Sequence, residues 1–306
     1  MAEPLPICYL NGAYLPLREA RISPLDRGFL FADGVYEVLP VHAGHMFRFR
    51  EHFDRLARNL AAIRLAAPHT HGQWLTILDE LVRRNRDRAI GHHSDVEDMY
   101  LYVQVTRGAE YSRNHSFPAH ATPSVFAMAA PLPTLSEEER LRGCAAITIE
   151  DFRWGRCDIK STALLANVLM KQQAVDAGAQ EAIIVREGEV LEGASSNVFV
   201  VSGGCISTPP DSPHILPGVT RDTARLLTRQ SLPVQARRIG VAELRSADEV
   251  WISASTRDVL AVTMIDGQPV GSGVPGPLWK RMYEAFRDAR SNPLFDTGSP
   301  PDTRHV

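Results

Sequence analysis

The sequence predicts an α+β protein with two domains. Its 306 residues can form two substantial cores. Short alternating stretches typical of β-strands occur among amphipathic patterns typical of helices. A proline-rich segment, APLPTLSEEER, separates the halves and ends in an acidic helix start. We therefore expect an N-terminal domain over 1–130, a linker over 131–136, a C-terminal domain over 137–288 and a disordered tail over 289–306.

Composition and charge argue against nucleic-acid and membrane partners. A formal net charge of −3 gives no basic surface for nucleic acid or anionic lipid. No apolar run is long enough to span a bilayer, and the N-terminus lacks the features of a signal peptide. The scattered cysteines form no C-x-x-C pair, which favours reduced thiols in the cytoplasm and predicts no metal site: Cys8, Cys144, Cys157 and Cys205.

Periodicity and turn residues place the elements of both halves. In the first half we expect a hairpin turning at Asn11-Gly12, then strands and helices at 34–41, 49–65, 74–86, 99–108 and 122–130. In the second half we expect a helix from Ser161 to Ala177, strands at 181–186, 189–191 and 198–201, a helix starting near Gly218 and a last helix at 276–287.

Lysine is rare in this chain, so the position of each one is informative. Among 33 basic residues only Lys160, Lys171 and Lys280 are lysines. A primary amine can lose its proton and attack a carbonyl, whereas a guanidinium stays protonated. Lys171 and Lys280 lie in helical patterns among polar neighbours and need no special role. Lys160 lies where a strand-like segment meets a helix start, and there we expect a reactive amine.

A carboxylate followed by small residues is the second candidate position. Glu192 ends a short strand and precedes Gly-Ala-Ser-Ser-Asn, whose small side chains let a flat ligand approach and whose polar groups offer hydrogen bonds. A solvated turn acid is the simpler interpretation of Glu192 alone. Together with Lys160, it suits pyridoxal phosphate, which needs a lysine for its aldehyde and often an acid beside its ring nitrogen.

Two longer motifs, CDIKSTALLANVLMKQ and EAIIVREGEVLEGASSNVF, resemble the core of the branched-chain and D-amino-acid aminotransferases, the fold-type IV enzymes that use pyridoxal phosphate. The resemblance extends from about Tyr9 to Arg287 and is strongest to the D-amino-acid aminotransferases. It implies a smaller N-terminal α/β domain and a larger, β-barrel-like C-terminal domain with flanking helices that binds pyridoxal 5′-phosphate. It also implies a cofactor at the domain interface and a homodimer whose active sites are completed by the neighbouring subunit.

The resemblance gives the cofactor-binding residues their roles. Lys160 would hold the cofactor as a Schiff base and move the substrate's α-proton, and Glu192 would keep the ring nitrogen protonated. From the residues alone, Arg55 is a snorkelling surface arginine and Thr220 an ordinary helix cap. The resemblance implies instead that Leu216 packs on the ring and that the phosphate is bound by Arg55, Val219, Thr220, Ala254 and Ser255.

Three further residues match substrate-binding positions of the family. Tyr36 lies in DGVYEV, where the family directs a hydroxyl toward the substrate. Arg113 and His115 are two residues apart, so in an extended loop both side chains point the same way, as binding of a carboxylate requires. They resemble the pair that binds the substrate carboxylate in D-amino-acid aminotransferases. Without the resemblance, Tyr36 is interpreted as an ordinary sheet tyrosine, and Arg113 and His115 as solvated loop residues.

These residues predict a transaminase that moves the amino group of a D-amino acid such as D-alanine to pyruvate or 2-oxoglutarate in a ping-pong cycle. A branched-chain L-aminotransferase, an (R)-amine transaminase or an aminodeoxychorismate lyase would share Lys160 and Glu192, and these alternatives stay open. A protein that binds the cofactor without catalysis is disfavoured, because a binder needs no acid at the ring nitrogen.

Overall fold

The computed structural model describes residues 3–89, 98–120, 122–229, 232–290 and 292. The chain divides into two compact units: the first comprises residues 1–133, 159–163 and 292–306, and the second comprises residues 134–158 and 164–291. Lys160 therefore belongs to the first unit, although it stands well inside the second half of the sequence. Of the tail expected to be disordered, residues 291 and 293–306 lie outside the described part of the chain.

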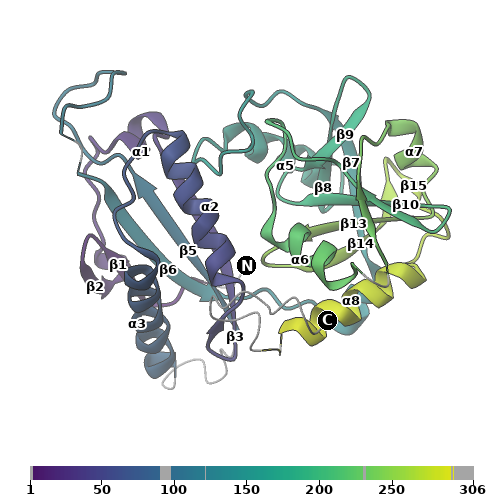
Figure 1. Cartoon of the computed structure of the whole chain (residues 1–306), viewed down its shortest axis with the longest axis horizontal. Helices are drawn as coiled ribbons and strands as arrows, with labels where there is room; N and C mark the ends of the chain where they lie inside the picture. The colour runs from purple at the N-terminus through teal and green to yellow at the C-terminus, as the bar shows by residue number, and fades with distance from the viewer. Residues whose placement is uncertain (1–2, 90–97, 121, 230–231, 291, 293–306) are drawn as a thin grey trace. The chain divides into compact units, whose positions relative to one another are not determined.

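The first unit is built on an antiparallel six-stranded sheet in the order β2-β1-β6-β5-β3-β4 (Figure 1). The strands are β1 (Ile7–Leu10), β2 (Ala13–Pro16), β3 (Gly34–His42), β4 (His45–Met46), β5 (Met99–Thr106) and β6 (Ser124–Pro131). The expected hairpin forms at Asn11-Gly12, where φ values of 49° and 96° require the left-handed region that Asn and Gly tolerate.

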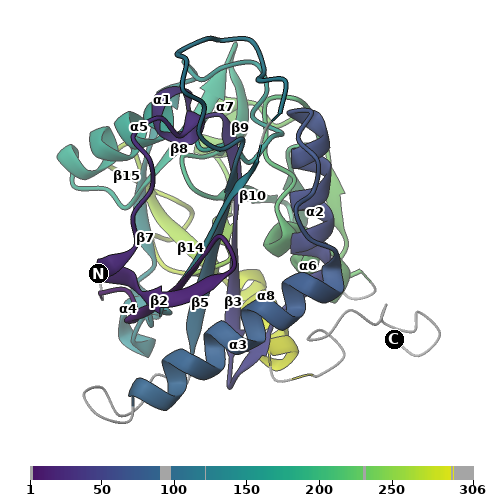
Figure 2. The ribbon, with the colours of Figure 1, turned by 90° about the vertical axis from the view of Figure 1, so that its left-hand side faces the viewer.

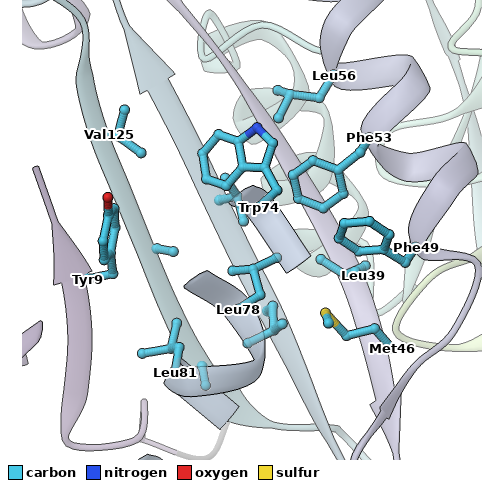
Figure 3. Packing of buried hydrophobic residues seen from close by; sticks show 14 of the residues in the cluster. Tyr9, Leu39, Met46, Phe49, Phe53, Leu56, Trp74, Leu78, Leu81 and Val125 are labelled. Carbon is cyan, nitrogen blue, oxygen red and sulfur yellow. The ribbon is translucent and has the colours of Figure 1, made fainter. Parts of the chain in front are cut away.

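Two long helices cover one face of this sheet, as Figure 1 and Figure 2 show. The helices of the unit are η1 (Leu17–Glu19), α1 (Arg27–Phe31), α2 (Phe49–Ala62) and α3 (His71–Ala89). Phe53 of α2 and Trp74 of α3 lie 5.3 Å apart between ring centroids and pack in one core with Leu39 of β3 (Figure 3). Because side chains alternate along a strand, Tyr36 points to the opposite face from Leu39.

The second unit is built on a nine-stranded sheet in the order β12-β11-β10-β13-β14-β7-β8-β9, with β15 paired to β14. The sheet curls, because β9 at one end also contacts β10 near the other end. The strands are β7 (Cys144–Glu150), β8 (Glu181–Arg186), β9 (Glu189–Gly193), β10 (Asn197–Ser202), β11 (Cys205–Thr208), β12 (Val234–Ala236), β13 (Glu249–Ala254), β14 (Asp258–Ile265) and β15 (Gln268–Pro269).

Five helices flank this sheet in the described part of the chain: α4 (Glu137–Arg142), α5 (Leu165–Asp176), α6 (Val219–Leu227), α7 (Val241–Arg245) and α8 (Pro277–Arg290). The acidic segment after the proline-rich stretch begins α4 with a capping box, in which Ser136 and Glu139 bind each other's backbone amides. The helix α5 packs on β8 and β7, and α6 and α8 contact each other as well as β13 and β14.

The segment that carries Lys160 pairs with the edge of β3 that faces away from β5. The amide of Tyr36 donates to the carbonyl of Lys160 at 3.0 Å, and the amide of Thr162 donates to the carbonyl of Gly34 at 3.0 Å. The expected helix start at Ser161 is therefore wrong, and α5 begins only at Leu165. Pairing with β3 satisfies backbone groups that a helix would have used, so the segment stays extended.

Three further expectations concern membranes, metals and thiols. In the part of the chain that the structure describes, no helix is both long and apolar enough to cross a membrane. Within the same residues, no cluster of His, Cys, Asp and Glu could hold a metal ion. All four cysteines are free, and Cys205 alone among them is exposed.

Candidate active site

The amine of Lys160 lies over an aromatic ring of the first unit. Its Nζ is 4.3 Å from the ring centroid of Tyr36, and this ring stacks on Tyr102 with centroids 5.6 Å apart. The Tyr102 hydroxyl donates to Gln104 at 2.6 Å, and burial raises the pKa of Tyr102. The structure thus brings together Lys160 and Tyr36, two residues that were predicted to meet the cofactor and the substrate.

The other two lysines have different surroundings. Lys171, on α5, donates its Nζ to the backbone carbonyl of Gln180, and burial lowers the pKa of this amine. Lys280 lies exposed on α8. Neither is held by strand pairing as Lys160 is, so the structure favours Lys160 as the positioned amine.

A fully buried ionic group lies on the helix side of the same strand. Glu37 of β3 is 0% exposed and accepts bonds from Arg55 Nε at 2.7 Å and a terminal Arg55 nitrogen at 2.8 Å. His52 Nδ1 lies 2.9 Å from the second Glu37 oxygen. Burial raises the pKa of Glu37, but the charge and bonds of Arg55 and the bond from His52 outweigh burial, and the net pKa lies well below its usual value.

The surroundings lower the pKa of the His52 imidazole below its ordinary value. Burial lowers its pKa, and the positive charges of Arg55 and Lys160 lower it further, against the opposing effect of Glu37. An imidazole beside a carboxylate carries a proton on the nitrogen that faces the carboxylate, because a carboxylate accepts only. His52 therefore donates from Nδ1 to Glu37.

The environment of Arg55 excludes one of its two interpretations. A snorkelling side chain would be exposed at its tip, whereas Arg55 is 3% exposed and holds Glu37 with two donors. Its role in binding the cofactor phosphate stays a prediction. Its partners were not predicted from the sequence, although Glu37 follows Tyr36 in DGVYEV and His52 lies one helical turn before Arg55.

Glu192 is the corresponding buried carboxylate of the second unit. It is 5% exposed, which excludes a solvated turn acid. One oxygen accepts a bond from Arg153 at 2.5 Å, and the other accepts from the backbone amide of Leu216 at 2.9 Å. Asn197 donates to the carbonyl of Leu216 at 2.9 Å, so the predicted ring-packing residue and the predicted acid are fixed to one another.

A second carboxylate holds Arg153 in place. Asp151 accepts from Arg153 Nε at 3.0 Å and from Arg186 at 2.9 Å, and Arg153 also donates to the carbonyl of His214 at 2.9 Å. Burial raises the pKa of Asp151, but the bonds from Arg153 outweigh burial and lower it overall. Arg153 was not predicted from the sequence. Its position in an Asp-x-Arg spacing, seven residues before Lys160, could have indicated it.

The small-residue loop after Glu192 is fixed by the buried carboxylate of Glu181. The hydroxyls of Ser195 and Ser196 donate to one Glu181 oxygen at 2.9 and 3.0 Å. These serines were expected to offer hydrogen bonds to a ligand, whereas here they hold the loop to β8. The loop is therefore rigid before any ligand binds.

The predicted phosphate-binding residues of the second unit gather at the start of α6. The helix begins at Val219, with Gly218 as its N-cap, so Thr220 is not the cap. The Thr220 hydroxyl lies 3.5 Å from the Ser255 hydroxyl, and α6 contacts β13, which ends at Ala254. Free amides at a helix start together with two hydroxyls fit an anionic group such as the cofactor phosphate.

The predicted carboxylate-binding pair shares one aromatic ring in the first unit. The guanidinium of Arg113 lies 5.2 Å from the centroid of Phe31, and the His115 ring lies 5.2 Å from the same centroid. Both side chains are exposed. The structure thus places the two side chains together at Phe31, as the spacing of two residues required.

Comparisons with known proteins identify the family of this chain. The family model described as amino-transferase class IV matches residues 34–265. The D-alanine aminotransferase of Bacillus licheniformis is 41% identical over 280 residues, covering 91% of this chain and 95% of that protein. The D-alanine aminotransferase of Staphylococcus haemolyticus is 37% identical, with the same coverage of both chains.

A solved structure has the same fold. The branched-chain amino acid aminotransferase of T.th., solved with pyridoxamine 5′-phosphate, superposes with a TM-score of 0.85 at 27% identity, over 96% of this chain and 97% of that one. The expected α+β fold with a curled second sheet is confirmed by this likeness. The chain belongs to the class IV aminotransferases, the pyridoxal phosphate-dependent transaminases of fold type IV.

Proposed function

We propose that this transaminase moves the amino group of a D-amino acid such as D-alanine to a 2-oxo acid such as pyruvate or 2-oxoglutarate. The observation that carries the proposal is the placement of Lys160, whose backbone is paired with β3 and whose amine lies 4.3 Å from the Tyr36 ring. The relatives named D-alanine aminotransferase, at 41% and 37% identity, support the choice of donor.

Pyridoxal phosphate supplies an aldehyde for the amine and a ring that accepts electrons from the substrate carbon. Lys160 Nζ would hold the cofactor and, once released, would accept the α-proton of the substrate. Glu192, held by Arg153, would keep a proton on the ring nitrogen. The start of α6 with Thr220 and Ser255 would bind the phosphate, and Arg55 remains a predicted donor to it.

Recognition of the substrate carboxylate is assigned to Arg113 and His115. A guanidinium and an imidazole at one ring, 5.2 Å each from Phe31, offer several donors to one anion. Tyr36 directs its hydroxyl to the substrate. We propose that this loop serves the active site of a neighbouring copy, so that the functional form is a homodimer. A net charge of −3 and four free thiols support a cytoplasmic enzyme with no nucleic-acid or membrane partner.

A branched-chain L-aminotransferase is the second candidate, because the solved structure with a TM-score of 0.85 is named as one. The two activities differ in the donor that converts the cofactor from its aldehyde to its amine form. Holoenzyme incubated separately with D-alanine and L-leucine distinguishes them by the change in absorbance. Conversion by D-alanine supports the proposal, whereas conversion by L-leucine alone overturns it.

The lysine that binds the cofactor covalently can be identified by an experiment that does not depend on the amino donor. Borohydride reduction of the holoenzyme followed by peptide mapping should place the cofactor on Lys160. A label on Lys171 or Lys280 would overturn the assignment of the amine. Release of pyruvate from aminodeoxychorismate, with the cofactor left in its aldehyde form, would instead favour the lyase.

A further inference from the structure

The loop that carries Arg113 and His115 is held by a buried arginine of the same unit. Arg27, the first residue of α1, has a side chain that is 4% exposed. One terminal nitrogen donates to the carbonyl of Asn114 at 2.6 Å, and the other donates to the carbonyl of His115 at 3.2 Å. Both carbonyls belong to the short backbone segment that carries Arg113 and His115, so holding them fixes the directions of these two side chains.

The guanidinium of Arg27 is itself fixed in orientation. Its Nε donates to Asp33 at 2.8 Å, and the same carboxylate binds Arg107 at 2.8 and 3.1 Å. Burial raises the pKa of Asp33, but the bonds from Arg107 and Arg27 outweigh burial, and the net pKa is lowered. Asp33 is therefore a charged anchor that holds the plane of the Arg27 fork.

The ring of Phe31, four residues after Arg27 on α1, completes the support. It lies 4.9 Å from the Arg27 guanidinium and 5.2 Å from both Arg113 and His115. Arg27 thus binds the backbone of the loop, and Phe31 lies against the side chains of Arg113 and His115. Within the described residues of the loop, the Ser116 amide also donates to the Asn114 side chain.

We infer that Arg27 is the positioning residue that sets recognition of the substrate carboxylate, because its fork fixes the peptide between Asn114 and His115. The inference rests on the proposed function of Arg113 and His115. A guanidinium has donors at fixed angles in one plane and can hold two successive carbonyls and a carboxylate at once. An ammonium is a point donor, so Arg27→Lys keeps the charge and loses the geometry.

Arg107 offers a matched control. It binds the same Asp33 carboxylate and is equally buried, with a side chain 3% exposed. Its terminal nitrogens donate to the carbonyls of Ile63 and Arg64 at the end of α2, at 2.7 and 3.3 Å, and not to the carbonyls of Asn114 and His115. The Arg107 guanidinium also lies 3.8 Å from the centroid of Phe117, at the end of the loop. Arg107→Lys should therefore loosen the chain near Phe117 but leave the carbonyls of Asn114 and His115 bound to Arg27 and carboxylate recognition unchanged.

The first readout is hydrogen exchange of the protein without substrate. Amides of residues 113–116 should exchange faster in Arg27→Lys than in Arg107→Lys, while those of β3 and β5 stay as in the wild type. Equal exchange over 113–116 in the two variants would overturn the inference. This measurement does not depend on turnover, so it decides the structural role even if D-alanine proves not to be the donor.

The second readout is a double-variant cycle on the holoenzyme. Arg27→Lys should raise the KM for D-alanine about tenfold, comparable to one charge-assisted hydrogen bond, with kcat within about twofold. In an Arg113→Ala/His115→Ala background the same change should have no further effect on KM, because the groups it positions are gone. Additive effects would overturn the inference. An unchanged KM in Arg113→Ala/His115→Ala alone would overturn the proposed carboxylate site instead.

Discussion

Each unit buries one glutamate–arginine pair beside a residue of the site, and the two pairs differ in what else the glutamate binds. In the first unit, Glu37 is 0% exposed and accepts from the side chains of Arg55 and His52 and, at 3.3 Å, from the amide of the next residue, Val38. In the second unit, Glu192 is 5% exposed and accepts from Arg153, from the backbone amide of Leu216 and, at 3.4 Å, from the side chain of Asn197. The first pair joins α2 to β3, whereas the second holds a carboxylate at the edge of a small-residue loop.

We expect different roles for the two carboxylates: Glu37 supports the fold and holds Arg55 in place, whereas Glu192 serves the chemistry. A buried carboxylate whose donors all come from the surrounding core stabilises that core, and removal of it leaves an uncompensated cation. A carboxylate that is held by an arginine and by a backbone amide is fixed in direction. It can then interact with a third group, such as the ring nitrogen of the cofactor. Four variants test the comparison, beginning with the one that should change the molecule most.

Glu37→Ala should lower the free energy of unfolding by about 3–5 kcal/mol, because it leaves the buried Arg55 without its carboxylate. Urea unfolding of the protein, followed by circular dichroism, measures this loss. Glu80→Ala is the matched control, since Glu80 binds Arg83 and Arg84 on the surface of α3, where solvent screens the pairs, and should contribute little. A loss at Glu37 no larger than at Glu80 would show that the buried pair does not stabilise the first unit.

Glu192→Gln should act on turnover more than on stability. The amide keeps the size of the side chain and an oxygen for the Leu216 amide, while Arg153 keeps its bonds to Asp151. A neutral group cannot hold the proton on the ring nitrogen, so kcat should fall about 100-fold, or roughly 2.7 kcal/mol in the barrier. Steady-state kinetics with D-alanine and pyruvate measure it. A fall of less than about threefold would remove Glu192 from the chemistry.

The sequence predicted the residues that lie in turns and at element ends better than their partners. Asn11-Gly12 predicts its hairpin because few residues tolerate the backbone that the turn requires. The start of α5 was misplaced from Ser161 to Leu165, because pairing with β3 overrides the local preference of Ser and Thr for a helix start. Lys160 was found by its rarity, but its assignment to the first unit depends on a strand more than 100 residues earlier.

The ionic partners of the site could not be read from the sequence for a related reason. Arg153 and Glu192 are 39 residues apart, and Glu37 and Arg55 are 18 apart. Local periodicity contains no information on such pairs, since either arginine alone looks like a surface residue. Residue rarity and motif order indicated where the chemistry lies, whereas the network that fixes each group emerged only from the fold.

The pH dependence of stability should differ between the wild type and Glu37→Gln. The folded pKa of Glu37 lies below its unfolded value of about 4.3, so the unfolded chain takes up the proton first. The stabilisation is complete above that value and is lost as the pH falls through it toward the folded pKa. Between about pH 5 and pH 3 the unfolding free energy of the wild type should fall more steeply, by up to about 1.4 kcal/mol per pH unit. Parallel slopes in urea titrations would contradict this.

Arg186→Ala should have the smallest effect, because Arg186 is linked to Glu192 only through Asp151 and Arg153. Arg186 binds Asp151 at 2.9 Å with a side chain 28% exposed, so solvent screens the pair and its loss should lower stability by about 1 kcal/mol or less. Asp151 stays bound to Arg153, so kcat should stay within about twofold. Arg238→Ala, whose partner is Glu189 on the surface, is the control. If Arg186→Ala lowered kcat as far as Glu192→Gln, the role of Glu192 would depend on the whole chain of charges from Arg186 through Asp151, and this prediction would be wrong.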